Sequence, residues 1–173
     1  ERSYRGFRSH HGPITHANED KWVATALMWK PVTALQQSFI RTKQQNHAGF
    51  LKMMDLRTNS SNNTVYADAE GNIAYYHGNF IPKRNLDLDY TKPVDGSDPK
   101  TDWNGLHEVK ENILIVNPAN GWIQNCNSTP FSAAGINSPK RDNYPSYMVS
   151  FRGPCTAGPL RRLSKKDQDL TLD

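Results

Sequence analysis

The residues of this sequence best suited to chemistry lie in the segment GWIQNCNSTP, at positions 121–130. This segment gathers side-chain amides and hydroxyls around Cys126: Gln124, Asn125, Asn127, Ser128 and Thr129. Such side chains at a strand end can close a turn by bonding to nearby backbone groups. A side-chain amide can also donate a hydrogen bond to the oxyanion that develops during acyl transfer. The residue types alone favour the turn and leave the oxyanion role open.

Three histidines near the start of the chain suggest a metal site: His10, His11 and His16. A structural metal such as zinc needs about four ligands, and no cysteine or carboxylate completes a set at a recognisable spacing. We therefore expect solvated or strand-end histidines. Two pairs of carboxylates could serve acid–base catalysis: Asp68 with Glu70, and Asp87 with Asp89. Turn-forming and surface roles explain these four residues more simply.

The elements that must position these residues follow from periodicity and turn signals. Helices are expected over residues 32–42 and 47–56, where apolar residues recur at helical spacing. The first has Val32, Leu35, Phe39 and Ile40 on its apolar side, with Gln36, Gln37, Arg41 and Lys43 outside. DAEGN separates two β-rich runs, residues 64–68 and 72–80, and predicts a hairpin.

Other segments are less regular. The run RSYRGFRSHHGPI predicts a strand that ends in a turn at Gly12-Pro13, and residues 21–30 form either a strand or a buried helix. Residues 81–109 are rich in turn residues, which predicts a long structured loop. Two short strands are expected at residues 113–116 and 122–126. Together these elements predict an α+β fold with antiparallel strands.

Composition narrows the class of protein. The 173 residues carry 21 Lys and Arg against 17 Asp and Glu, a net charge of +4. This mild excess lacks the basic and aromatic stripe that binds nucleic acid, so we expect no nucleic-acid partner. No apolar run approaches the roughly 18 residues of a membrane span. The length fits a single domain over residues 1–173. Cys126 and Cys155 could form a disulfide or be small buried residues.

Several segments resemble one family. They are RSHHGPI, NTVYADAEGNIAYYHGNFIPKR, PVDGSD with DWNGLH, and VNPANGWIQNCNSTPFSAAG. They occur in the same order and at similar spacing in the β-chain of penicillin acylase-like enzymes, a family that includes acyl-homoserine-lactone acylases. The resemblance covers residues 2–153, and YADAEGNIAY and NPANGWIQNCNSTP are its most specific parts.

The resemblance implies a fold and a mechanism. Family members are N-terminal nucleophile hydrolases with an αββα sandwich, of which this chain would carry a part. A serine freed by autoproteolysis attacks an amide, and its own α-amine is the general base. The asparagine that binds the oxyanion aligns with Asn127, with Asn125 and Gln124 as its supports. Four aromatic residues are expected to fill the layer between sheet and helix rather than to contact an acyl chain: Tyr66, Tyr75, Tyr76 and Phe80.

The resemblance also places part of the site elsewhere. The family's nucleophile precedes the segment equivalent to RSYRGFRSHHGPI, and Ser3 does not match the family's Ser-Asn start. An arginine near the active site corresponds to Arg152, with Arg161 and Arg162 as competing positions. Calcium occurs in several members, with ligands largely from outside this segment, and Met148 stands at one carboxylate position. No other cofactor is expected.

These implications predict an interior fragment of a longer precursor, inactive on its own and prone to self-association. Its partners would be the α-chain and the N-terminal part of the β-chain, in the periplasm or outside the cell. The substrate would be a small acyl amide such as an acyl-homoserine lactone or a penicillin. Two alternatives remain open. One is a non-catalytic module that binds a glycan or peptide around Trp103 and Trp122, and the other is an inactive acylase homologue.

Overall fold

The computed structural model describes residues 3–59 and 62–148. These residues form six strands and two α-helices, joined by turns and short 3-10 helices. In chain order the elements are β1 (Arg8–Ser9), β2 (Gly12–Asn18), β3 (Lys21–Ala24), α1 (Pro31–Arg41), α2 (His47–Met54), β4 (Asn63–Ala67), β5 (Ile73–His77) and β6 (Leu114–Val116). Within this described part no helix is long and apolar enough to cross a lipid bilayer.

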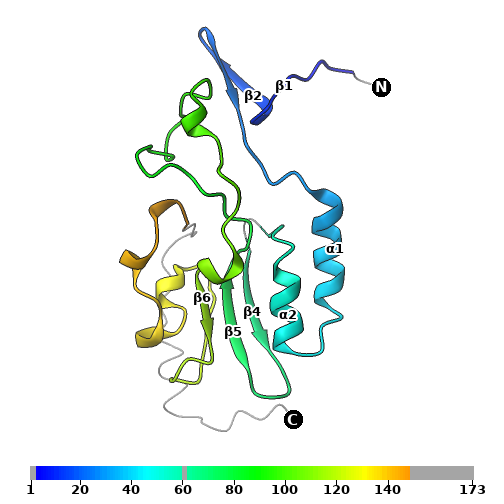
Figure 1. The fold of residues 1–173 in the computed structure, drawn as a ribbon, viewed down its shortest axis with the longest axis vertical. Helices are drawn as coiled ribbons and strands as arrows, with labels where there is room; N and C mark the ends of the chain where they lie inside the picture. Colours follow the sequence, from blue (N-terminus) through cyan, green and yellow to red (C-terminus); the bar gives the residue numbers. More distant parts are fainter. Residues whose placement is uncertain (1–2, 60–61, 149–173) are drawn as a thin grey trace.

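The strands form two antiparallel sheets of three strands each, ordered β1-β2-β3 and β4-β5-β6. Figure 1 shows the two sheets at opposite ends of the molecule, with α1 and α2 side by side along the second sheet. In β4 and β5, Asn63 pairs with His77 and Val65 with Tyr75, and on the other side of β5 Tyr75 pairs with Ile115. This helix-on-sheet arrangement is the α+β fold that the sequence predicts.

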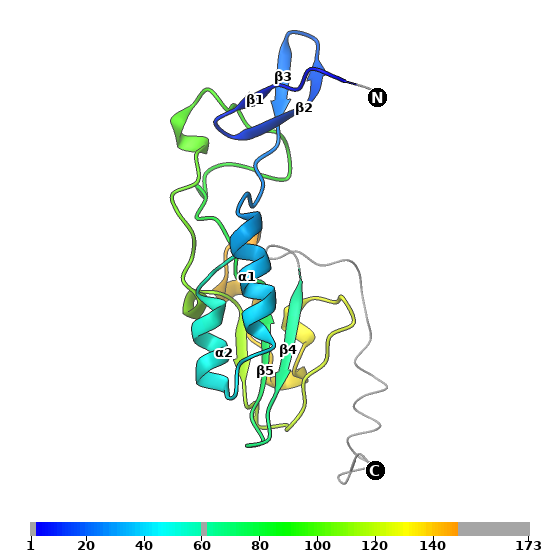
Figure 2. The same ribbon diagram turned by 90° about the vertical axis from the view of Figure 1, so that its right-hand side faces the viewer.

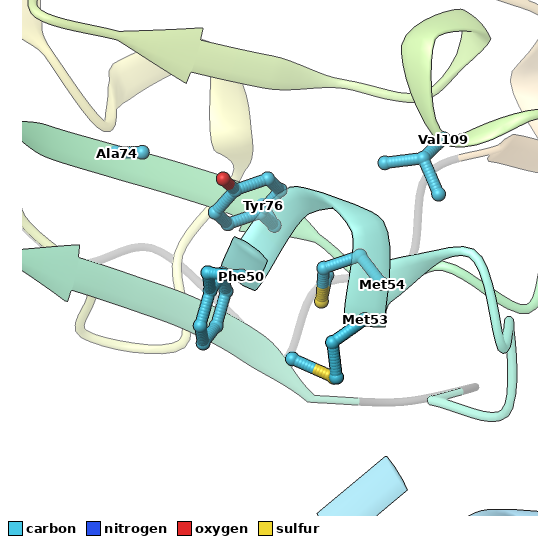
Figure 3. Packing of buried hydrophobic residues seen from close by; sticks show 6 residues of the cluster. All are labelled: Phe50, Met53, Met54, Ala74, Tyr76 and Val109. Carbon is cyan, nitrogen blue, oxygen red and sulfur yellow. The ribbon is translucent and has the colours of Figure 1, made fainter. Parts of the chain in front are cut away.

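The core lies on both faces of the second sheet because side chains along β5 alternate between them. Ala74 and Tyr76 face α2, and Figure 3 shows them with the rest of this cluster: Phe50, Met53, Met54 and Val109. Tyr75 faces the opposite side and packs with three further buried residues: Ile115, Ala133 and Ala134. Each tyrosine is 1% exposed, so a core role is confirmed for both, but only Tyr76 lies in the expected layer between sheet and helix, because Tyr75 faces the opposite side of the sheet.

The β4–β5 hairpin is confirmed, and Asp68 closes its turn. One carboxylate oxygen of Asp68 accepts from the backbone N–H groups of Glu70 (3.0 Å) and Asn72 (2.9 Å). The other accepts from the Tyr66 hydroxyl at 2.9 Å. These hydrogen bonds hold the pKa of Asp68 below its usual value, and the bond from the side-chain amide of Asn72 has the largest effect. Desolvation of the carboxylate acts in the opposite direction but is outweighed. Asp68 therefore forms the turn, as its sequence context predicts.

The helices are confirmed, but the outward face of α1 differs from expectation. Val32, Leu35 and Phe39 are exposed, whereas Gln37 is buried. Oε1 of Gln37 accepts from the backbone N–H (3.0 Å) and hydroxyl (2.6 Å) of Thr58. A buried amide is tolerated when its polar atoms are bonded, so Gln37 occupies the position that an apolar residue would otherwise fill.

Three other local expectations were decided or corrected. The first hairpin turns at His10-His11 rather than at Gly12-Pro13, because Gly12 and Pro13 open β2 and pair with Ser9 and Arg8 of β1. Residues 21–30 include the strand β3, so the helix is excluded there. Residues 122–126 form no strand, because Asn125 begins a side-chain-closed turn in place of a ladder. The long loop at 81–109 is present and contains a 3-10 helix, Pro99–Thr101.

Candidate functional site

The segment 121–130 lies against the face of the second sheet that α2 leaves uncovered. Ile123 packs on the cluster around Tyr75, and the backbone N–H of Gln124 donates to the Ala133 carbonyl at 2.8 Å. The buried side-chain amide of Gln124 donates to the Ser128 hydroxyl at 3.3 Å and to the Ser132 carbonyl at 3.1 Å. Gln124 therefore fixes both ends of the loop that contains Asn125 and Asn127.

Asn125 shapes the tip of this loop. Its Oδ1 accepts from the backbone N–H of Asn127 at 3.1 Å, which closes a turn through the side chain of the first residue. The same oxygen accepts from Nδ2 of Asn63 at 3.0 Å, so the turn is attached to β4. Asn127 has a φ of 58°, a left-handed conformation that asparagine adopts more readily than most residues.

The side chain of Asn127 is exposed, and its amide forms no hydrogen bond with any residue in the ranges 3–59 and 62–148. Its backbone, in contrast, is held by the turn. A side-chain amide that is uncommitted and attached to a fixed backbone is available as a hydrogen-bond donor to a ligand. The structure thus brings Gln124, Asn125 and Asn127 into one loop with different hydrogen-bonding states.

Two residues that the sequence analysis missed support this loop from the sheet: Asn63 and His77. Nδ1 of His77 lies 2.7 Å from Oδ1 of Asn63. Because Asn63 donates its Nδ2 to Asn125, its Oδ1 is the acceptor, so His77 donates Nδ1–H. Burial lowers the pKa of His77 and favours its neutral form. A signal was present, since extending the predicted hairpin by one residue before Thr64 places Asn63 opposite His77.

The pKa of His77 gives a pH-dependent prediction. Because the folded-state pKa lies below the usual value of about 6.5, the contribution of neutral His77 to stability is present above that value and lost as the pH falls. We expect the free energy of unfolding to decrease between about pH 7.5 and about pH 5.5, above the range in which most carboxylates titrate. Urea unfolding at a series of pH values measures this slope.

A matched pair of variants assigns the slope to this residue. His77→Asn keeps a side-chain N–H for Asn63 and removes the titrating ring, so it should flatten the slope. His16→Asn makes the same change at an exposed position of β2 and should leave the slope as it is. An undiminished slope in His77→Asn would show that another group titrates in this range.

A cavity of about 430 Å³ lies beside the hydrogen-bond network formed by His77, Asn63 and Asn125. Asn63 and His77 contribute to its wall, and aromatic and basic side chains line it as well, among them Phe80, Arg84 and Tyr147. The guanidinium of Arg84 lies 5.3 Å from the ring centre of Tyr90 and 5.9 Å from that of Tyr147. The volume lies within the range of small-molecule sites, so the network that supports Asn125 lies beside a space that could hold a small ligand.

Other expected site residues lie outside the described residues: Arg152, Arg161 and Arg162. Cys126 is disulfide-bonded, so of the two alternatives, a disulfide or a small buried residue, the disulfide holds for this cysteine. Cys155 lies outside the described residues. Met148 is 4% exposed and presents a thioether, whereas calcium takes oxygen ligands. The residue at this position therefore does not fit the calcium site that the family resemblance suggests, and no reaction step depends on it.

The two tryptophans proposed to bind a glycan or peptide are each partly buried. Trp122 is partly buried and lies 3.1 Å from the position that a Cβ on Gly135 would occupy. Trp103 is partly buried as well and packs edge-on against Phe80, with 5.9 Å between ring centres. Both indoles therefore pack within the protein.

The described residues form an α+β scaffold that presents the side-chain amide of Asn127 beside a sheet. Comparison with known proteins identifies the family of this chain. The penicillin amidase family matches residues 1–170. The chain therefore belongs to the penicillin amidase family.

Two relatives show how much of a longer protein this chain matches. The chain is 34% identical over 113 residues to penicillin G acylase of Escherichia coli, an alignment that covers 64% of this chain and 12% of the relative. The structure is similar to a thermostable penicillin G acylase from Alcaligenes faecalis, with a TM-score of 0.60 and 28% identity. That match covers 67% of this chain and 21% of the other. The chain thus spans a small part of the length of the relatives it matches.

Proposed function

We propose that this chain supplies the oxyanion-binding loop of an amidohydrolase that cleaves a linear amide. The observation that carries the proposal is the state of Asn127, whose exposed side-chain amide bonds to none of the described residues while its backbone is held in the turn. Membership of the penicillin amidase family supports the class of reaction. The substrate class is a small acylated amine, such as an acyl-homoserine lactone or a penicillin.

In the proposed reaction, the hydroxyl oxygen of an N-terminal serine from another part of the complete protein attacks the amide carbonyl carbon. The free α-amine of that serine accepts the hydroxyl proton, and the carbonyl oxygen becomes an anion. Nδ2–H of Asn127 donates a hydrogen bond to this anion. The C–N bond then breaks, the leaving amine takes up the proton, and water releases the acyl group from the serine in a second addition and elimination.

The other residues of the loop act through Asn127. Asn125 holds its backbone N–H, Asn63 holds Asn125, and Gln124 fixes the ends of the loop. These residues orient the donor before the charge develops, which is where most of the catalytic advantage of such a donor arises. Arg152 is assigned a positioning role on the family resemblance alone.

The setting of the reaction is part of the proposal. The remainder of the acylase, its α-chain and the N-terminal part of its β-chain, would supply the nucleophile, a second oxyanion donor and most of the substrate pocket. The complete protein would act in the periplasm or outside the cell, and calcium could bind to parts of it outside this chain. The exposed apolar face of α1, formed by Val32, Leu35 and Phe39, is consistent with packing against further protein.

The test is to express the complete protein that contains this chain and to measure amine release from a penicillin and from an acyl-homoserine lactone. We expect hydrolysis of at least one amide by the processed protein and none by the 173-residue chain alone. A processed protein with a free N-terminal serine and no amidase activity would overturn the proposal. A precursor that never cleaves itself would instead identify an inactive homologue.

A further inference from the structure

Three potential metal ligands meet at the end of the molecule remote from α2. His10 and His11 form the turn between β1 and β2, and Asp102 follows the 3-10 helix Pro99–Thr101 in the long loop. One ligand atom from each lies within 4.8 Å of the others. Figure 2 shows the β1–β2 turn beside the part of the loop that carries this 3-10 helix.

The separations within this cluster suit a shared ion better than direct hydrogen bonds. Nε2 of His10 and Nδ1 of His11 each lie 3.6 Å from the same oxygen, Oδ1 of Asp102. A contact of this length is not a hydrogen bond. Two ligands each about 2.1 Å from a tetrahedral ion lie about 3.4 Å apart, which is close to the separation found here.

A second observation concerns the other nitrogen of His11. Nε2 of His11 lies 2.8 Å from the carbonyl oxygen of Gly96, and a carbonyl only accepts, so Nε2 carries the proton. The lone pair is therefore on Nδ1, the atom that faces Asp102. Histidines that bind metals commonly donate their remaining ring N–H to a backbone carbonyl in this way.

The backbone at position 96 is suited to this arrangement. A Cβ on Gly96 would lie 2.9 Å from Nε2 of His11, closer than ordinary packing allows. Only glycine lets the loop approach the ring closely enough for this hydrogen bond. The ring of His11 also packs against the ring of His10, since the two ring centres lie 3.8 Å apart.

We propose that His10, His11 and Asp102 bind a divalent transition metal ion of the zinc type. Two imidazoles and one carboxylate suit zinc, copper or nickel rather than calcium or magnesium, which prefer oxygen ligands. Three protein ligands leave one position for water or for a group from another part of the complete protein. The ion would connect the β1–β3 sheet to the long loop, two segments 91 positions apart between His11 and Asp102.

The experiment uses the untagged 173-residue chain, since a histidine tag would itself bind metal. Zinc binding is measured by calorimetry, and cobalt binding by the visible absorption of the Co²⁺ ion, which reports nitrogen and oxygen coordination. We expect one ion per chain and a higher melting temperature with zinc than with a chelator. Absence of a one-to-one complex with either ion would overturn the proposal.

Variants locate the site. His11→Ala and Asp102→Asn should each abolish the one-to-one complex, and His16→Ala is the matched control at an exposed histidine of β2 that should keep it. Gly96→Ala retains all three ligands and displaces the ring of His11, so binding should weaken about 10- to 100-fold. Far-UV circular dichroism verifies that each variant is folded. Binding that persists in both His11→Ala and Asp102→Asn would place the ion elsewhere.

Discussion

Replacing Asn127 with alanine in the complete, processed acylase is expected to lower kcat about 10²- to 10³-fold with little change in KM. Removal of one oxyanion donor has an effect of this size because the hydrogen bond strengthens as charge develops on the oxygen. The ground-state carbonyl gains far less from the same donor, so substrate binding is nearly unchanged. Steady-state kinetics with the substrate that the complete protein hydrolyses fastest gives both constants.

The left-handed backbone of Asn127 requires a second variant. Alanine at a φ of 58° is strained by roughly 1 to 2 kcal/mol, which could distort the loop and lower kcat for a reason unrelated to the amide. Asn127→Gly removes the amide without this strain and should lose as much activity as Asn127→Ala. Recovery of activity in Asn127→Gly would assign the effect to the backbone.

A matched asparagine elsewhere controls for the substitution itself. Asn117 also has a positive φ, 44°, and its side chain bonds to the backbone N–H of Ile73 at 2.9 Å in the turn after β6. Asn117→Gly should lower stability modestly and leave kcat unchanged. If kcat is unchanged in both Asn127 variants as well, the oxyanion assignment is wrong.

The parts of the fold that the sequence predicted are those whose determinants are local. In the DAEGN turn, Asp68 and Asn72 lie four positions apart and are joined by a hydrogen bond, and the strands on either side pair directly. A short stretch of sequence is therefore enough to predict this hairpin. The face of α1 was assigned wrongly because Gln37 is buried through its bonds to Thr58, 21 positions away. No periodicity in the helix itself indicates that an amide is satisfied by a distant hydroxyl.

In the candidate site, too, features that depend on neighbouring residues could be predicted and features that depend on distant residues could not. Asn127 was predicted through a motif and Asn125 as its support, and the two are joined by a local turn closed by a side chain two residues away. Asn63 and His77 belong to the same hydrogen-bond network but lie 62 and 48 positions from Asn125. The neighbourhood of His10, His11 and Asp102 could not be predicted for the same reason. Asp102 is brought to His10 and His11 only by the path of the long loop.

Substitution of a buried aromatic residue is expected to have a large effect on the stability of the chain. Phe50 is 5% exposed and packs between α2 and the second sheet, with 4.7 Å from its ring centre to that of Tyr66 and 5.6 Å to that of Tyr76. Phe50→Ala should reduce the free energy of unfolding by about 3 to 5 kcal/mol, because it removes buried apolar surface and leaves a cavity. Urea unfolding of the 173-residue chain measures the loss.

Phe39→Ala is the matched control, since it makes the same change on the neighbouring helix at a residue that is 67% exposed. Its ring contacts the Lys43 ammonium at 5.3 Å, an exposed interaction of about 0.5 to 1 kcal/mol at most. In a monomeric chain Phe39→Ala should therefore change stability by less than about 1 kcal/mol. If it instead destabilises the chain as much as Phe50→Ala does, and this loss shrinks with dilution, then the α1 face is buried between copies in solution, because the stability of an associated state depends on concentration.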